Sequence, residues 1–144
     1  MQALPQHYLV TAAAEAAGNV TVSSAGLPAL ETNAPPEFGG PDGLWSPETL
    51  FAAAIADCYI LSFRACSTAA KLEWLGLNAE VDAVLDRVER QLRFTEVEIR
   101  ATLHLPAGSD EARARQVAEK AERSCLISNS LSAGRRLDLR IEYA

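Results

Sequence analysis

The sequence predicts an α+β fold in which an antiparallel sheet packs on one long central helix. Residues 48–74 contain neither glycine nor proline and are largely apolar, which is typical of a long buried helix. Residues 77–103 alternate between apolar and polar side chains, as the strands of an antiparallel hairpin do when one face lies in water. A second, amphipathic helix and a closing strand follow toward the C-terminus.

The long helix has a clear start in the sequence. Ser46 is a suitable N-cap, Pro47 takes the first helical position, and Glu48 places a negative charge in the first turn. We expect the helix to continue to about Trp74 and to end before Gly76. Roughly 26 residues at 1.5 Å each give a rod of about 39 Å.

The same helix is apolar on nearly every side between Leu50 and Phe63. A helix of this kind must be buried all round, but a sheet covers only one side of it. We therefore expect a second subunit to cover the rest, in a dimer built on this helix.

Shorter elements are expected on either side. Residues 7–33 have the pattern of short strands with turns, and the proline- and glycine-rich residues 33–48 form a loop. Residues 109–125 predict an amphipathic helix capped by Ser109 or Asp110. Its expected buried stripe consists of Ala114, Val117, Ala118 and Ala121. A short turn or helix from Leu126 to Leu131 and a strand over residues 135–144 complete the chain.

Length and charge narrow the possible functions. The 144 residues suit one domain, and we expect residues 1–144 to form a single one. A net charge of −6 argues against nucleic acid or an anionic membrane as a partner. We expect no signal segment at the N-terminus, and no uninterrupted apolar run reaches the roughly 20 residues that span a bilayer. Three cysteines in this setting indicate a cytoplasmic protein with reduced thiols.

The three cysteines have different surroundings. Each could be a small hydrophobic residue of the core. Polar Asp57 and Tyr59 flank Cys58, so its segment is not uniformly apolar. Cys125 joins two helical segments, and a thiol at a helix N-terminus meets amides that lower its pKa. We expect Cys125 to be more exposed than Cys66 and better suited to thiol exchange. We interpret Cys66 as packing, since about 12 Å along the helix separates it from Cys58 and excludes a disulfide between them.

The sequence contains no motif that indicates a metal site or a serine hydrolase. There is no C-x-x-C motif, and only His7 and His104 could join the thiols as ligands, so we expect neither a metal site nor a cofactor. A serine hydrolase is not indicated either, because no G-x-S-x-G elbow occurs.

Two stretches, "SPETLFAAAIADCYILSF" and "CLISNSL", each contain one of these cysteines. The first is similar to a helix of the OsmC/Ohr proteins (osmotically inducible protein C and organic hydroperoxide resistance protein), which begins Asn/Ser-Pro-Glu and carries a cysteine ten residues after the glutamate. The second resembles that family's second-cysteine stretch, usually Cys-Pro-x-Ser. The order of expected elements matches the family over essentially the whole chain.

This resemblance implies a cysteine-based thiol peroxidase that reduces organic (alkyl or lipid) hydroperoxides. Cys58 would form a sulfenic acid, and Cys125 would resolve it as an intramolecular disulfide. An external dithiol, for which a lipoyl-type dithiol is a candidate, would then reduce that disulfide. Glu48 would match the family's active-site glutamate. The fold implied is the family's intertwined homodimer, with the sites at the subunit boundary.

The chain departs from the family pattern at two places. The family's active-site arginine usually lies in the N-terminal strands, but no arginine precedes Arg64 here, and Leu126 replaces the usual proline. The alternative function is therefore a non-catalytic, small-molecule-binding module of the same fold, or a redox sensor.

A thiolate at Cys58 would need a basic group to stabilise it, because Glu48 alone would raise its pKa. We expect that group to come, from the same chain or from the partner chain, from a set of four arginines: Arg64, Arg123, Arg135 and Arg136. We also expect an apolar substrate pocket from the Phe38–Trp45 loop and the helix start, where Trp45 and Phe51 stand near Glu48. The alternative for these two aromatic residues is a place in the dimer core.

Overall fold

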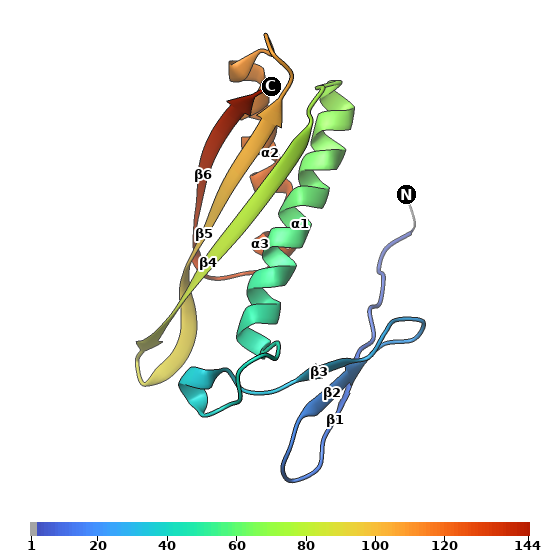
Figure 1. The fold of residues 1–144 in the computed structure, drawn as a ribbon, viewed down its shortest axis with the longest axis vertical. Helices are drawn as coiled ribbons and strands as arrows, with labels where there is room; N and C mark the ends of the chain where they lie inside the picture. Colours follow the sequence, from blue (N-terminus) through green and yellow to red (C-terminus); the bar gives the residue numbers. More distant parts are fainter. Residues whose placement is uncertain (1–2) are drawn as a thin grey trace. The chain divides into compact units, whose positions relative to one another are not determined.

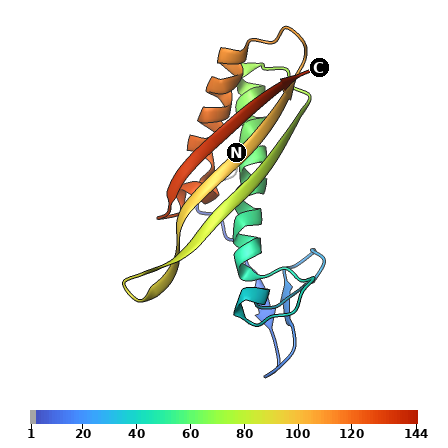
Figure 2. The same cartoon turned by 60° about the vertical axis from the view of Figure 1, so that its left-hand side comes forward.

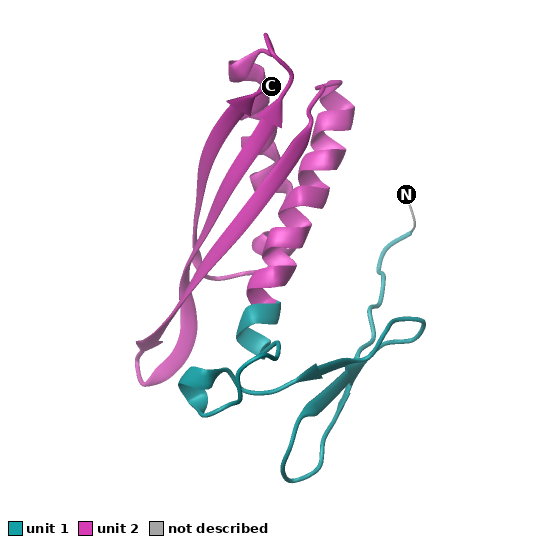
Figure 3. Ribbon diagram, viewed as in Figure 1, with its two compact units in different colours: residues 1–50 teal, residues 51–144 magenta. Residues whose placement is uncertain are grey.

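The computed structural model describes residues 3–144 (Figure 1), so the first two residues of the expected single domain lie outside this description. The chain divides into two compact units, residues 1–50 and 51–144 (Figure 3). The first unit holds three short strands, and the second holds a larger sheet with the hydrophobic core.

The sheet of the first unit is antiparallel. Its strands, β1 (Thr11–Ala13), β2 (Val20–Ser23) and β3 (Leu30–Thr32), lie in the order β1-β2-β3. They confirm the short strands predicted for residues 7–33. The loop that follows contains a single turn of 3-10 helix, η1 (Pro36–Phe38).

The long helix α1 (Pro47–Ala70) starts as the sequence predicts. The Ser46 hydroxyl accepts a hydrogen bond from the Thr49 amide at 3.1 Å, and the Thr49 hydroxyl accepts one from the Ser46 amide at 2.8 Å. This reciprocal pair satisfies two amides at the helix start, which makes Ser46 the N-cap.

The end of α1 differs from the prediction, because the helix stops at Ala70 rather than near Trp74. Lys71 takes a left-handed conformation with φ of 54°, which ends the helix without a glycine. The amide of Leu72 then donates to the carbonyl of Ser67 at 2.9 Å and closes the last turn.

The second unit contains a three-stranded sheet of order β4-β5-β6. β4 (Gly76–Val88) and β5 (Gln91–Leu105) form the predicted antiparallel hairpin. β6 (Gly134–Tyr143) instead runs parallel to β5, whereas the sequence predicts an antiparallel sheet throughout. The reason is the connection: α2 (Glu111–Ser124) and α3 (Leu126–Asn129) form a crossover between β5 and β6, and a helical crossover brings the next strand back in the same direction.

One face of this sheet packs against α1 and α2 to form the core (Figures 1 and 2). The predicted stripe of α2 is buried there: Ala114, Val117, Ala118 and Ala121. The Asp110 carboxylate caps α2 by accepting a hydrogen bond from the Arg113 amide at 3.2 Å. The hydroxyl of buried Tyr59 donates to the carbonyl of Ala118 at 3.2 Å, which ties α1 to α2. The α+β fold class is therefore confirmed.

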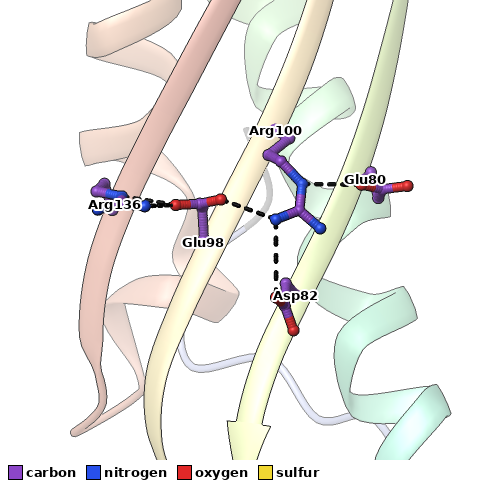
Figure 4. A network of polar contacts seen from close by, with 5 residues as sticks. All are labelled: Glu80, Asp82, Glu98, Arg100 and Arg136. Atoms are coloured by element: carbon purple, nitrogen blue, oxygen red, sulfur yellow. Dashed lines mark hydrogen bonds and ion pairs between the residues drawn. The ribbon is translucent and has the colours of Figure 1, made fainter.

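The other face of the sheet is polar, as the alternating pattern predicts (Figure 4). Arg100 donates to Glu80 at 2.8 Å and to Glu98 at 2.9 Å, and it lies 3.7 Å from Asp82. Arg136 pairs with the second oxygen of Glu98. Hydrogen bonds from Arg136 and Arg100 hold the pKa of Glu98 below its usual range. Because these side chains are charged, the network marks the side of the sheet that faces water. Exposed ion pairs of this kind contribute little stability.

By length and composition alone, α1 could cross a membrane, with a mean hydropathy of 1.4. The expectation that no segment spans a membrane considers only uninterrupted runs of apolar residues. Asp57 and Arg64 interrupt such a run in this helix. The core helix of a soluble protein passes the same test. One stripe of α1 is indeed buried in the core: Ile55, Tyr59, Phe63 and Ser67.

Candidate active site

Two of the three predicted site residues, Cys58 and Cys125, meet in the second unit. Cys58 lies on α1 and is partly buried. Cys125 is the C-cap of α2 and the N-cap of α3, as its place in the sequence predicts. The Cys125 thiol donates a hydrogen bond to the Cys58 sulfur. Both thiols are free, so the structure contains the pair in its reduced form.

Hydrogen bonds favour the thiolate form of Cys58. Burial raises the pKa of Cys58, but four hydrogen bonds outweigh this effect and hold the pKa below its ordinary value. Their donors are the Ile127 amide, the Cys125 thiol, the Ser62 hydroxyl and the Leu126 amide. Ser62 lies one turn further along α1, with its oxygen 3.9 Å from the sulfur. The two amides belong to the first turn of α3, where amides have no acceptor within the helix.

Cys125 differs from Cys58 in its burial and in the direction in which its pKa is shifted. The prediction that it is more exposed than Cys66 is wrong, because Cys125 is fully buried and Cys66 is only partly so. Burial raises the pKa of Cys125, and its neighbour Cys58 raises it further, although hydrogen bonds with Ser128 act in the other direction. The amides of Leu126 and Ile127 at the start of α3 lower the pKa of Cys58, while the Ser128 amide lowers that of Cys125 without outweighing its burial.

The arginine expected beside Cys58 is not found within the described chain. None of the four candidates contributes to the lowered pKa of Cys58: Arg64, Arg123, Arg135 and Arg136. Arg135 bonds Glu122 at 2.8 Å, and Arg136 bonds Glu98. These two arginines thus neutralise carboxylates near their own strand, and backbone amides take the expected place of a cation at Cys58.

Glu48, the third predicted site residue, lies in the first turn of α1 and belongs to the first unit. Its Oε1 is buried and has no hydrogen-bond partner, the one such side-chain atom in the part of the chain that the structure describes. Glu48 also lines a cleft of about 470 Å³ within the first unit.

The lining of this cleft agrees in part with the predicted apolar pocket. Phe38 and the start of α1 contribute to it as expected, but Trp45 and Phe51 do not. Trp45 is 47% exposed, and Phe51 stacks on Phe94 in the second unit with ring centroids 4.3 Å apart. Phe51 therefore has a packing role in one chain.

The sequence did not indicate three groups that act on Cys58: Ser62 and the amides of Leu126 and Ile127. Ser62 could have been found from its position four residues after Cys58 on a helix. The two amides leave no signal in the sequence, because they reach Cys58 only when α3 packs against α1.

Cys66 packs against the core, as predicted. Within residues 3–144, no group of three or more histidine, cysteine, aspartate or glutamate side chains could hold a metal ion.

Comparisons with known proteins identify the family. Residues 40–140 match the family model for OsmC-like proteins. The chain belongs to the OsmC-like family. The uncharacterised protein YmaD of Bacillus subtilis is 27% identical to this OsmC-like protein over 108 residues, which cover 73% of the chain and 72% of YmaD.

Two solved structures extend this comparison. An OsmC-like protein of unknown function from Vibrio cholerae shares the fold, with a TM-score of 0.85, 15% identity, and coverage of 94% of this chain and 99% of that one. An organic hydroperoxide resistance protein OsmC from Legionella pneumophila has a TM-score of 0.76 and 25% identity, over 98% of this chain and 99% of that one. The predicted family resemblance is confirmed.

Proposed function

We propose that this OsmC-like protein is a thiol peroxidase that reduces organic hydroperoxides with Cys58 and Cys125. The observation that carries the proposal is the contact between these thiols, in which one pKa is lowered and the other raised. An attacking thiol needs thiolate character, whereas a resolving thiol has to stay close to it until the first step is complete.

The reaction begins at the Cys58 thiolate. Its sulfur attacks the O–O bond of the hydroperoxide and forms an S–O bond, while the O–O bond breaks and the alkoxide leaves as an alcohol after taking up a proton. Cys58 becomes a sulfenic acid. The Cys125 sulfur then attacks the Cys58 sulfur, which forms the disulfide and releases water. An external dithiol, such as a lipoyl-type one, reduces the disulfide by exchange and is itself oxidised.

Hydrogen bonds support this chemistry without an arginine in the same chain. Amides that point at a sulfur stabilise its negative charge as a cation would. The Ile127 amide is the strongest of these donors to Cys58. Glu48 is proposed as the third site residue, with a role toward the substrate rather than toward the thiolate.

We further propose that the protein acts as a homodimer in the cytoplasm. The support is α1, on which only one stripe is buried in a single chain, while Leu61 is 51% exposed. A partner helix would cover such apolar side chains.

The proposal is tested with cumene hydroperoxide or tert-butyl hydroperoxide and a dithiol reductant. We expect turnover by the wild type, none by Cys58→Ser, and most of the wild-type rate in Cys66→Ser, which is the matched control on the same helix. Equal loss in both variants with folding intact would contradict the assignment of Cys58. Ligand binding without turnover in the wild type would favour the binding module.

A further inference from the structure

The helix α3 carries two of the amides that reach Cys58, but it is too short to hold its own position. It has four residues, and isolated helices of this length are not stable in water. On its inner side, Ser128 is buried and Ile127 packs against the core. Its last residue, Asn129, is exposed. The place of that end therefore depends on polar contacts with neighbouring elements.

Arg135, near the start of β6, makes such contacts with all three nitrogens of its guanidinium group. Its Nη1 donates to Oδ1 of Asn129 at 2.8 Å. Its Nη2 donates to the Glu122 carbonyl at 2.7 Å, and its Nε donates to Oε1 of Glu122 at 2.8 Å. One side chain thus joins β6 to both α2 and α3.

Asn129 extends this link back to α2. Its Nδ2 donates to the Arg123 carbonyl at 3.0 Å. Glu122 and Arg123 lie in the last turn of α2, where carbonyls have no donor within the helix and a nearby cation is favourable. The side chains of Arg135 and Asn129 therefore bridge α2 and α3 across Cys125, the residue that joins them.

Arg136 provides a contrast on the same strand. It points to the opposite face of the sheet, where it pairs with Glu98. Its side chain is 76% exposed, whereas that of Arg135 is 28% exposed. An ion pair in water constrains its partners little, but a planar guanidinium with three partnered nitrogens fixes their geometry.

We infer that Arg135 is a positioning residue for Cys58: it holds α3 so that the Leu126 and Ile127 amides stay directed at the Cys58 sulfur. The same link keeps Cys125, the N-cap of α3, beside that sulfur. Arg135 thus acts on the thiolate through backbone amides rather than through its own charge.

For the reaction, this role rests on the proposed function. A loosened α3 would leave less thiolate for the attack on the hydroperoxide, and it would hold Cys125 less often beside the Cys58 sulfenic acid. Loss of Arg135 should therefore slow both steps. The position of α3 itself can be measured without a hydroperoxide, so its test is independent of the peroxidase assay.

Two measurements on the reduced protein test the inference, both in a Cys66→Ser background. The rate of Cys58 alkylation against pH gives a midpoint, and amide hydrogen exchange followed by NMR reports how firmly α3 is held. In Arg135→Ala we expect the midpoint to rise by about half a pH unit or more, and the Ile127 amide to exchange at least about tenfold faster. Arg136→Ala is the matched control and should change neither value.

Two further variants separate the position of α3 from the charge of Arg135. Arg135→Lys keeps the charge, but a single ammonium group does not replace the three bonds, so most of the effect of Arg135→Ala should remain. Asn129→Ala leaves Arg135 bonded to Glu122 and removes the bonds at the end of α3. It should shift both measurements in the same direction as Arg135→Ala. If Arg135→Ala does not fold, these two variants decide the question.

Three outcomes would overturn the inference. Wild-type behaviour of Arg135→Lys would assign the effect to charge. A shift in Arg136→Ala as large as that in Arg135→Ala would assign it to the field of the whole protein. Finally, an unchanged exchange rate of the Ile127 amide in Arg135→Ala and Asn129→Ala would mean that packing alone holds α3.

Discussion

The thiols of Cys58 and Cys125 are hydrogen-bonded to each other, yet their pKa values move in opposite directions. Cys58 collects donors from α1 and α3, whereas Cys125 is fully buried at the junction of α2 and α3. As pH rises, Cys58 therefore loses its proton first while Cys125 keeps its own and donates it to the thiolate. This order suits an attacking thiol and a resolving thiol.

We expect Cys125→Ala to raise the pKa of Cys58 by about 0.7 of a pH unit, because it removes a hydrogen bond worth about 1 kcal/mol. Cys125→Ser keeps a donor at this position and should raise the pKa less. The measurement is the rate of Cys58 alkylation against pH in a Cys66→Ser background. If the alanine variant has the same midpoint as its parent, the Cys125 thiol does not stabilise the thiolate.

Tyr59 predicts how stability depends on alkaline pH. Burial, with Glu122 as a smaller cause, raises the pKa of Tyr59 above its usual range. The buried phenol keeps its proton as pH rises, while the unfolded chain loses it near pH 10, so this stability is full below pH 10 and is lost above it. The unfolding free energy should fall by about 1.4 kcal/mol between pH 8 and pH 11 because of this residue.

Tyr59→Phe should remove that alkaline loss and should cost about 1 kcal/mol at neutral pH, since the Ala118 carbonyl loses its donor. Urea unfolding at both pH values measures the two effects. Tyr143→Phe is the control, because Tyr143 is 47% exposed. An alkaline loss that persists in Tyr59→Phe would assign it to other groups.

The sequence predicts the identities of the site cysteines better than their surroundings. Cys58 and Cys125 are recognised from the motifs around them, which are local in the chain. Burial of Cys125 and the donors to Cys58 depend on how α1, α2 and α3 pack, and no local pattern contains that information. For this reason the expected exposure of Cys125 is wrong, and the expected arginine is not found within one chain.

At the scale of elements, α3 is the segment that shapes the site. Its N-cap is Cys125, whose backbone is extended with ψ of 107°, and the amides of its first two residues donate to Cys58. The residue before a proline favours an extended conformation, and proline is tolerated at the first position of a helix. The position of Leu126 is therefore compatible with the proline found in the resembling family stretch.

We expect Leu126→Pro to fold normally and to gain up to about 1 kcal/mol of stability, because proline restricts the unfolded chain. It removes the weakest of the four donors to Cys58, so the pKa of Cys58 should rise only slightly. Leu126→Ala retains the amide and is the matched control for loss of the exposed side chain. Urea unfolding and alkylation against pH measure both effects, and a strong rise in the pKa would contradict the order of donors.

Helices whose start or buried face is encoded by neighbouring residues in the sequence are predicted well. The Ser46 and Asp110 caps and the buried stripe of α2 follow from residue types and spacing. The end of α1 was missed because Lys71 adopts a left-handed conformation that its residue type does not indicate. The direction of β6 was missed because it follows from the α2–α3 crossover rather than from the strand's own sequence.

At the scale of the whole molecule, α1 has more apolar surface than its own chain covers. Its buried stripe faces the core of the second unit, but Leu61 is 51% exposed. This pattern is the basis of the proposed homodimer, since permanent interfaces resemble a divided hydrophobic core.

Light scattering at micromolar concentration should therefore find a dimer. Leu61→Glu should shift the protein toward monomer, because a charge would be buried in the interface. Thr68→Glu introduces the same charge at an exposed, polar position of α1 and is the control. A wild-type protein that is monomeric and stably folded under these conditions would contradict the dimer.

The most direct test of the account is the fate of the three cysteines after one equivalent of cumene hydroperoxide, without reductant. Peptide mapping by mass spectrometry identifies the bonds formed. We expect one intramolecular disulfide between Cys58 and Cys125, one molecule of alcohol released per disulfide, and a free Cys66. Unchanged thiols, or a Cys58 oxidised further while Cys125 stays free, would contradict it.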